Sequence, residues 1–242
     1  MSDALFLAEL ADPLPEVGTV IALTGDEGRH AAVVRRIRTG ESIVISDGQG
    51  RGVRARVTSA DKSGLSGEVT ERLSAPLAPR RYVAVQALAK GDRSELALEM
   101  LTELGIDEIV PWSASRSVVR WSADRADKSL ARWRATVREA TKQSRRLRVP
   151  VVTPAASTRE LGERMAQADL TLVLHEAASQ QLGEVTLPAQ GTIIIIIGPE
   201  GGISPDELDT FTDAGAHVVS ISDGVLRTST AGVVALAGLK LR

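Results

Sequence analysis

"IIIIIGPEGGISPDE", residues 193–207, joins an unbroken run of isoleucine to a glycine-rich turn with a glutamate at its centre. A continuous apolar run bounded by turn residues is typical of a strand that is buried on both faces of a parallel sheet. After the turn, Ser204 and Glu207 have capping-box spacing, and Pro205 stands at the first helical position. The stretch therefore predicts a central strand, a glycine turn and a helix.

Three interpretations of the glycine turn compete. A phosphate loop needs G-x-x-x-x-G-K-S/T, or G-x-G-x-x-G opening directly into a helix, and neither pattern is present. A structural turn accounts for Gly201 and Gly202 but not for Glu200, because a carboxylate at the end of a buried strand is costly without a role. The third interpretation is a site for a neutral or cationic ligand whose chemistry needs a base.

A second loop favours the third interpretation. "DGVLRTSTAG", residues 223–232, follows another predicted strand and places the cation of Arg227 and the hydroxyls of Thr228 and Thr230 beside small residues. "VLHEAAS", residues 173–179, supplies a third loop of the same kind. Ligands of α/β sheets bind outside the carboxyl ends of the strands, so we expect these loops to form one crevice, with the first two following adjacent strands.

The C-terminal part of the chain alternates between strand and helix patterns. Predicted strands cover residues 81–89, 106–112, 170–176, 192–198 and 216–222, and predicted helices cover 92–105, 124–145 and 228–241. In the first helix, Asp92 and Glu95 have capping-box spacing, and Gly105 marks its end. Such alternation predicts an α/β fold with a mostly parallel sheet covered by helices.

The N-terminal part has a different pattern. Residues 18–73 read as short strands separated by turn residues, with a short helix over 26–40 that Gly40 should end. Val53, Ala55 and Val57 alternate with arginines, which predicts one buried and one basic face. We expect a small module resembling a β-barrel, and a boundary at the Pro/Ala-rich linker over residues 74–80.

Composition limits the class of protein. The chain of 242 residues has no cysteine and a formal net charge of −2, and its three histidines are far apart in the sequence. We therefore expect no disulfide and no metal site, in a reducing compartment. The N-terminus lacks a basic n-region and a long apolar run, so a soluble cytoplasmic protein without a membrane segment is expected.

The basic residues are unevenly distributed. Residues 29–56 hold seven arginines against two acids, and residues 125–148 hold nine Lys or Arg against two acids. On a wheel of roughly 100° per residue, Leu130, Trp133, Val137 and Ala140 of the long helix share one arc, and the basic side chains lie opposite. The outward basic arc is a candidate surface for nucleic-acid phosphates, although a solvated face is the simpler alternative.

Four segments in order resemble the RsmE methyltransferases of the SPOUT superfamily: residues 87–121, "REATKQSRRLRVP" (138–150), "GPEGGISPDE" (198–207) and "LRTSTA" (226–231). The resemblance implies a PUA-like β-barrel RNA-binding domain over residues 1–74 and a SPOUT α/β domain with a C-terminal trefoil knot over 75–242. It also implies a homodimer that methylates N3 of one uridine in 16S rRNA of the small ribosomal subunit, with S-adenosylmethionine as the methyl donor.

The resemblance assigns a cofactor pocket by matching positions. Its expected residues are Leu174, His175, Glu176, Gly198, Pro199, Glu200, Gly201, Ile221, Leu226, Arg227, Thr228 and Ala231. N3 of uridine carries a proton, so the reaction needs a base or strong stabilisation of the anion left behind. We expect Arg227 to stabilise charge on the uracil oxygens, Glu200 to act as the base or to orient the loop, and Thr228 to act in catalysis or to cap the last helix.

RNA contacts are expected from both parts of the chain. The candidates are Arg35, Arg36, Arg38, Lys90, Arg116, Arg138, Lys142, Gln143, Arg145 and Arg146. Three positions depart from the family pattern: Ser229 replaces a usual Glu, Ile203 replaces a common Phe, and "KQSRR" (142–146) replaces a more usual E-Q-S-G-R. The lost acid at 229 keeps two alternatives open, a non-catalytic RNA-binding or ribosome assembly factor and a SPOUT enzyme that acts on tRNA.

Overall fold

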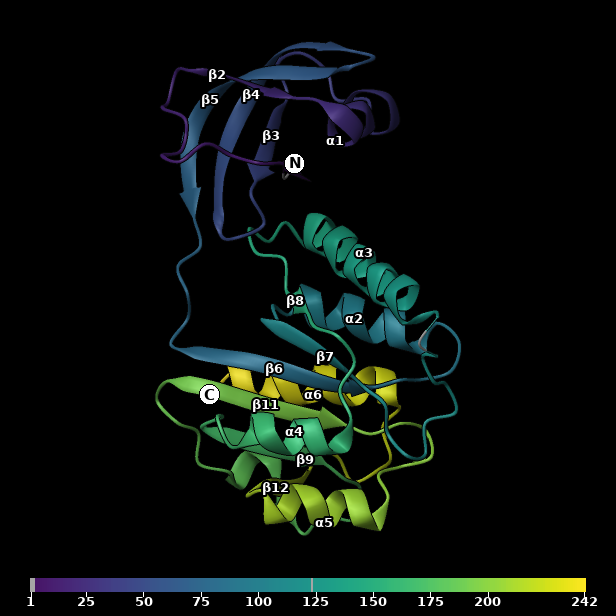
Figure 1. The fold of residues 1–242 in the computed structure, drawn as a ribbon. Coiled ribbons are helices and arrows are strands. Elements are labelled where there is room, and N and C mark those ends of the chain that lie inside the picture. The colour runs from purple at the N-terminus through teal and green to yellow at the C-terminus, as the bar shows by residue number, and fades with distance from the viewer. Residues whose placement is uncertain (1–2, 123) are drawn as a thin grey trace. The chain divides into compact units, whose positions relative to one another are not determined.

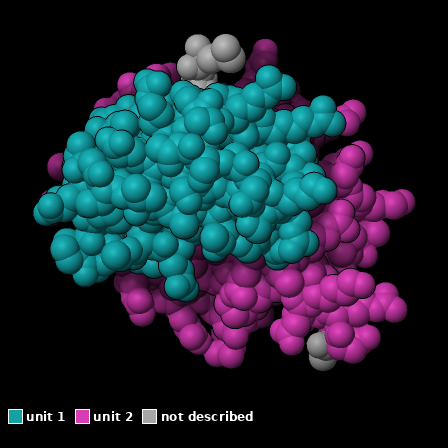
Figure 2. All heavy atoms as spheres, turned by 90° about the horizontal axis from the view of Figure 1, so that it is seen from above, with its two compact units in different colours: residues 1–77, 141–149 teal, residues 78–140, 150–242 magenta. Residues whose placement is uncertain are grey.

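The structure is a computed structural model that describes residues 3–122 and 124–242. The chain divides into two compact units, coloured separately in Figure 2. The first contains residues 1–77 and 141–149, and the second contains residues 78–140 and 150–242. No helix in the described part of the chain is long and apolar enough to cross a membrane.

The first unit is built on a five-stranded sheet in the order β1-β3-β4-β5-β2. Its elements are β1 (Ala4–Leu7), β2 (Val20–Leu23), α1 (Gly25–Arg29), a π-helical turn η1 (His30–Val34), β3 (Ser42–Ser46), β4 (Arg51–Asp61) and β5 (Gly64–Ser74). β1 runs parallel to β3, and the other neighbouring pairs are antiparallel. The sequence patterns predicted the strands β2 to β5 but not β1.

Alternation along β4 is confirmed, because Val53, Ala55 and Val57 are buried. The helix predicted over residues 26–40 ends earlier than Gly40. η1 stops at Val34, and Arg36 adopts a left-handed backbone with φ of 55°. A left-handed residue breaks the helical hydrogen-bond pattern, so the chain leaves the helix there.

A distant segment completes the first unit. The Ser46 hydroxyl donates to the Leu147 carbonyl at 2.9 Å, and the Val149 backbone N–H donates to the Gly48 carbonyl at 2.9 Å. The side chains of Leu147 and Val149 pack on a cluster that contains Leu5 and its neighbours in the sheet. The turn signals near residue 74 did not indicate that residues 141–149 return to this unit.

The second unit contains a seven-stranded sheet in the order β10-β12-β9-β11-β6-β7-β8, and every neighbouring pair is parallel. Its strands are β6 (Arg80–Ala87), β7 (Glu108–Trp112), β8 (Val151–Val152), β9 (Leu170–Leu174), β10 (Gln180–Gln181), β11 (Gly191–Ile197) and β12 (His217–Ser220). Its helices are α2 (Arg93–Glu103), α3 (Ala126–Ser144), α4 (Thr158–Met165), the 3-10 turn η2 (Leu182–Glu184), α5 (Pro205–Asp213) and α6 (Thr228–Lys240). The predicted α/β fold with a parallel sheet is confirmed, and α4, β8 and β10 are the elements that the patterns did not reveal.

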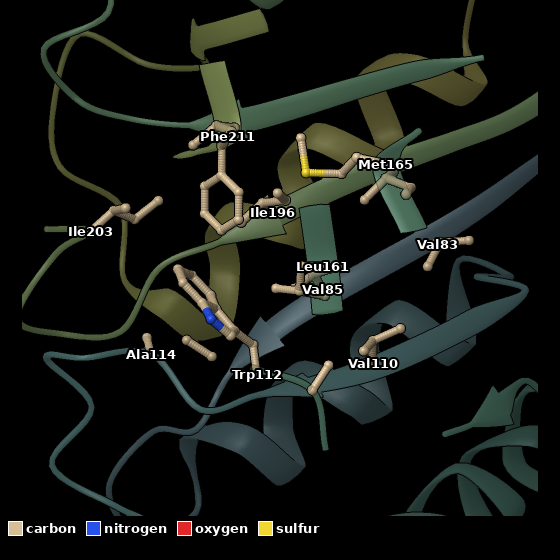
Figure 3. Close-up of a cluster of buried hydrophobic side chains, with 14 residues drawn as sticks. Val83, Val85, Val110, Trp112, Ala114, Leu161, Met165, Ile196, Ile203 and Phe211 are labelled. Carbon is tan, nitrogen blue, oxygen red and sulfur yellow. The ribbon is translucent and has the colours of Figure 1, made fainter. Parts of the chain in front are cut away.

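The isoleucine run is the central strand β11, which lies between β9 and β6. Ile194 and Ile196 face a cluster with Trp112 and Phe211, whose rings meet edge to face at 5.3 Å (Figure 3). Ile193, Ile195 and Ile197 are buried on the other face. Figure 1 shows helix α6 on one side of the sheet and α4 on the other, which explains why β11 needs apolar side chains on both faces.

Helix ends test the capping predictions. The Ser204 and Glu207 capping box at the start of α5 is confirmed. The predicted box at the start of α2 is wrong, because Asp92 makes no side-chain cap. Glu95 pairs instead with Arg132 of α3 at 2.9 Å, so an ion pair between helices replaces the local cap.

Candidate active site

The three loops singled out in the sequence follow β9, β11 and β12, at one edge of the parallel sheet. The prediction that the glycine loop and the arginine loop follow adjacent strands is wrong, because β9 lies between β11 and β12. The loop after β9 is therefore the middle of the three. All three strands are parallel, so their carboxyl ends meet at the same edge, as expected.

The loops enclose a cavity of about 300 Å³, which is joined by a smaller one of about 60 Å³ with shared walls. Of the twelve predicted cofactor residues, ten line the larger cavity and Ile221 lines the smaller one. Gly201 lines neither of them. Residues that line the larger cavity but were not predicted are Arg93, Ile197, Gly202, Ile203 and Val225.

The glycines of the turn have structural reasons. Gly202 has φ of 72°, and its backbone N–H donates to the Pro199 carbonyl at 2.9 Å, which closes the turn. A Cβ at Gly201 would lie 3.0 Å from the Arg116 carbonyl oxygen, so the two backbones approach too closely for a side chain. Gly201 therefore allows the segment that carries Arg116 to pack on the turn, while its neighbours form the cavity wall.

Glu200 joins two loops across the cavity rim. Its Oε1 accepts a hydrogen bond from the Lys90 backbone N–H at 3.1 Å and lies 3.1 Å from Nη1 of Arg93. The side chain is 24% exposed. Among the described residues, Oε2 has no hydrogen-bond partner, so this oxygen is available to a ligand. Glu200 is therefore held in position through Oε1, while Oε2 can serve a ligand, which gives this carboxylate a role at the end of a buried strand.

Glu207, seven residues later, has an enclosed environment. It accepts from the Ser115 N–H at 2.7 Å, the Ser115 hydroxyl at 2.8 Å and the Ser204 hydroxyl at 2.8 Å. Burial raises the pKa of Glu207, but the backbone and hydroxyl donors of Ser115 and Ser204 outweigh it and hold this pKa below its usual range. This carboxylate fixes the start of α5 and the segment after β7 rather than facing the cavity.

Helix α6 begins at the cavity with Arg227 as its N-cap residue, and the Arg227 side chain is exposed. Thr228 is buried; its hydroxyl donates to the Gly198 carbonyl at 2.8 Å and accepts from Nε2 of Gln86 at 3.0 Å. The alternative that Thr228 caps the helix is wrong, because no side chain caps it. Thr228 instead ties the first turn of α6 to the end of β11.

Packing explains the residues that follow. Ser229 is buried. A Cβ at Gly232 would lie 3.0 Å from the side chain of Ile197, so this glycine lets α6 approach β11. The close approach places the amino end of α6 beside the ends of the strands.

The predicted RNA contacts in the second unit lie near the cavity or on α3. The Lys90 backbone reaches Glu200, and the Arg116 guanidinium lies 3.4 Å from the Gly201 and Ile203 carbonyl oxygens. Arg138 is exposed on α3, opposite the buried Trp133 and Val137. The basic face of this helix is therefore as the wheel predicted up to residue 140.

The predicted contacts in the first unit differ in exposure. Arg35, Arg36 and Arg38 are exposed and form no ion pair with the described residues, and Gln143 and Arg145 are also exposed. Arg146 is only half-buried. The expected outward position of Lys142 is wrong, because its side chain is 11% exposed and Nζ lies 3.1 Å from Glu27 Oε1. The ion pair with Glu27 holds the Lys142 ammonium inside the first unit and away from solvent.

Two further observations concern possible metal ligands and a cavity residue that the sequence analysis missed. Within residues 3–122 and 124–242, no group of three or more His, Asp or Glu side chains is arranged to hold a metal ion. Arg93, which the sequence analysis missed, is the first residue of α2, and a cation shortly after a strand of the same sheet is the signal that could have found it.

Family models match both parts of the chain. Residues 76–240 match an RNA methyltransferase domain, and residues 23–70 match an RNA methyltransferase PUA domain. These matches agree with an N-terminal PUA-like domain followed by a parallel-sheet methyltransferase domain.

Known proteins resemble the chain over nearly its whole length. Ribosomal RNA small subunit methyltransferase E of Mycobacterium bovis is 47% identical over 94% of this chain and 88% of the relative. The protein of the same name from Bacillus subtilis is 31% identical over 97% of this chain and 94% of the relative. The crystal structure of that enzyme from Neisseria gonorrhoeae, bound to S-adenosyl methionine, superposes with a TM-score of 0.87 at 30% identity, covering 99% of this chain and 98% of the other.

Proposed function

Because the chain belongs to the ribosomal RNA small subunit methyltransferase E family, we propose that it methylates N3 of one uridine in 16S rRNA with S-adenosylmethionine as donor. The observation that carries the proposal is the single cavity formed by the loops after β9, β11 and β12. It gathers residues from three distant stretches of sequence at the strand edge where α/β sheets bind ligands.

The cavity fits the proposed cofactor by size and by chemistry. Its volume of about 300 Å³ is at the lower end of the range for small-molecule sites, roughly 300–1,000 Å³. Leu174, Ile221 and Leu226 offer apolar walls, and the turn at Gly198 and Pro199 brings backbone close to the ligand. We assign the remaining predicted residues to the same pocket, with Gly201 shaping the turn from behind.

S-adenosylmethionine supplies a methyl group on a sulfonium, which an acceptor nitrogen attacks in line. The protein must therefore hold that nitrogen in position and accept its proton. We assign proton acceptance to the free Oε2 of Glu200, while Oε1 stays bound to Arg93 and the Lys90 N–H. The exposed guanidinium of Arg227, at the same cavity, stabilises negative charge on the uracil oxygens.

Thr228 has a positioning role in this proposal. Its hydroxyl is engaged by Gly198 and Gln86, so it holds the glycine turn and α6 together rather than contacting the reacting atoms. Ser229 is buried and carries no acid, so the carboxylates that line the cavity are those of Glu176 and Glu200. We assign the base to Glu200 because two donors hold it in position through Oε1.

The proposal includes the finer features that the family implies. These are a PUA-like β-barrel RNA-binding domain over residues 1–74, a SPOUT domain with a C-terminal trefoil knot over 75–242, a homodimer and a cytoplasmic location with the small ribosomal subunit. In the sheet, β9 lies between β11 and β12, so the chain crosses β9 on its way from β11 to β12. This crossing supports the proposed knot.

The proposed RNA contacts come from polar side chains of each unit, and all but one of them are cations. Arg35, Arg36, Arg38, Arg145, the half-buried Arg146 and the neutral Gln143 contribute from the first unit, and Lys90, Arg116 and Arg138 contribute from the second. Lys142 supports the surface indirectly through its pair with Glu27. Phosphate contacts of this kind weaken steeply with added salt.

Nucleoside mass spectrometry of rRNA and tRNA from a deletion strain tests the proposal. We expect N3-methyluridine to disappear from small-subunit rRNA and to return when the intact gene is restored. Persistence of that nucleoside in the deletion strain would refute the assignment, and loss of a tRNA modification would transfer it to another substrate. Isothermal titration with S-adenosylmethionine should give heat, whereas a non-catalytic assembly factor should give none.

A further inference from the structure

A second cavity of about 280 Å³ lies in the same unit, outside the pocket described above. The segment between β6 and α2 contributes Gly91, the first turn of α2 contributes Glu95, and the segment before α3 contributes Arg120 and Trp121. Arg125 and Arg132 add two further cations to its wall. Gly91 and Glu95 lie on either side of Arg93, which lines the first cavity, so the two cavities are neighbours along the chain.

Trp121 offers a stacking surface in this cavity. Its ring meets Trp133 edge to face, with centroids 5.2 Å apart and an interplanar angle of 84°. Trp133 is buried, whereas Trp121 is partly exposed. A single edge-to-face contact can cover only one face of a ring, so at least one face of Trp121 is not used by Trp133. Unstacked bases of RNA bind on such aromatic faces.

Glu95 has hydrogen-bonding capacity that the protein does not use. Oε1 lies 2.9 Å from Nε of Arg132, and Oε2 is buried with no hydrogen-bond partner among the described residues. An unpartnered carboxylate oxygen is costly, so it needs a reason. The terminal torsion of a glutamate is soft, and a small turn of the carboxylate can present this oxygen to a donor that enters the cavity.

The carboxylate of Glu95 and the arginines of this cavity together favour one kind of base. A carboxylate repels the ring acceptors that flank the amino groups of adenine and cytosine, and the two carbonyls that flank the N–H of uracil. Guanine alone presents two adjacent N–H donors on its Watson–Crick edge, with O6 beside them for an arginine. Arg120, Arg125 and Arg132 supply such donors and can also neutralise a phosphate.

We infer that this second cavity binds a guanine base of the RNA substrate other than the uridine that is methylated, with Trp121 stacking on it and Glu95 accepting from its N–H groups. The inference rests on the proposed function for the presence of RNA. It adds an element that recognises sequence in a cavity distinct from the methyl-donor pocket.

The first test measures base binding without methylation. Guanosine and uridine 5′-monophosphates are titrated into the full-length protein, and the indole N–H signal of Trp121 is followed by NMR after assignment with Trp121→Phe. We expect guanosine monophosphate to bind roughly tenfold more tightly than uridine monophosphate, the lower range of one good base contact. Glu95→Gln should abolish the preference, whereas Glu99→Gln, an exposed glutamate one turn along α2, should preserve it.

The second test uses methyl transfer to isolated small ribosomal subunits. Glu95→Gln and Trp121→Ala should raise KM for the subunit roughly tenfold, and Trp121→Phe should restore most of the loss because it keeps an aromatic face. KM for S-adenosylmethionine should stay at the wild-type value, since neither residue lines the first cavity. Glu95→Gln and Trp121→Ala each weaken a contact, with Arg132 and Trp133 respectively, so the kinetics are measured at a temperature where every variant is folded. A rise in both KM values together would show a structural role for the changed residue and count against the inference.

The outcomes separate the two proposals. Equal binding of both nucleotides, no effect on the Trp121 signal, or wild-type KM for the subunit in Glu95→Gln and Trp121→Ala would overturn the guanine site while leaving methylation intact. A wild-type protein that prefers guanosine monophosphate through Glu95 but transfers no methyl group would uphold the guanine site and refute the proposed function.

Discussion

Glu200 and Glu207 are two carboxylates of one connection, seven residues apart, and the protein uses them in opposite ways. Glu207 is buried among the donors of Ser115 and Ser204, and no described contact joins it to the cavity. Glu200 stands at the cavity rim with two donors on one oxygen and none on the other. The second half of the connection is built for stability, and the first half is arranged for a ligand.

The difference shows how a site can be rigid and still open. Glu207 secures both the start of α5 and the segment after β7, so the turn before it is fixed at its far end. Thr228 fixes the near end through the Gly198 carbonyl. Glu200 therefore needs few contacts of its own to be positioned, which leaves an oxygen for chemistry.

Glu200→Gln gives the sharpest test of the comparison and the largest expected effect. Loss of a general base costs about 10² to 10⁴ in kcat, whereas the exposed pair with Arg93 should contribute less than about 1 kcal/mol to stability. Methyl transfer at saturating substrates and thermal melting measure the two effects, with Asp209→Asn on α5 as a charge-matched control. A change confined to KM would show that Glu200 orients the loop instead of accepting a proton.

Arg227→Ala extends the comparison to the loop after β12. Removing a donor that stabilises developing negative charge costs about 10²-fold in kcat. The side chain is exposed, so the melting temperature should stay close to the wild-type value. Arg227→Lys should recover part of the rate, because it restores the charge without the planar donor pair. Wild-type kcat in Arg227→Ala would remove this residue from the mechanism.

Glu207→Ala should show the opposite pattern, with a loss of stability of about 2 kcal/mol from the unpaired Ser115 N–H and the broken cap. Chemical denaturation measures the free energy of unfolding. At a temperature where the variant is folded, kcat should fall far less than in Glu200→Gln. A variant as stable as the wild type, yet inactive, would mean that the two glutamates do not divide the roles in this way.

Lowering the pH should destabilise the protein partly by protonating Glu207, and we expect this to be the smallest of the four predicted effects. The pKa of Glu207 is lower in the folded protein than in the unfolded chain, so its contribution to stability is complete above the unfolded pKa. The contribution is lost as the pH falls through the folded pKa. The free energy of unfolding, measured by denaturation at several pH values from neutral to acidic, should therefore fall less for Glu207→Gln than for the wild type. An equal fall in both proteins would contradict this linkage.

The sequence predicted the parts of the fold that depend on local pattern. The isoleucine run, the alternation in β4 and the Ser204 capping box are each determined by residues close together, and all three were confirmed. β8 and β10 have two residues each, so their periodicity is too short to recognise. β1 has four residues, like β2, but the glycine and aspartate turn residues that follow β2 are absent directly after β1. Their pairing depends on partners that lie far away in the sequence.

The site was predictable in membership but not in arrangement. Strand-end loops with glycine and arginine pointed to the cavity, but periodicity contains no strand order, so the place of β9 between β11 and β12 was missed. The same limit explains Glu95 and Lys142. Capping-box spacing predicted the role of Glu95, and the helical wheel predicted the position of Lys142. Each side chain instead pairs with a residue of another element, Glu95 with Arg132 and Lys142 with Glu27.

The return of residues 141–149 to the N-terminal unit has a consequence for biosynthesis. During translation, the first 77 residues leave the ribosome long before the segment that covers Leu5 and Leu7 and accepts from the Ser46 hydroxyl. Until α3 has been synthesised as well, residues 147 and 149 are not there to pack on Leu5, Leu7 and Val44 of the nascent sheet. Expression of the first 77 residues alone would leave this cluster without its cover permanently. Residues 78–140 belong to the second unit, so a fragment intended as an independent module needs residues 141–149 supplied in trans.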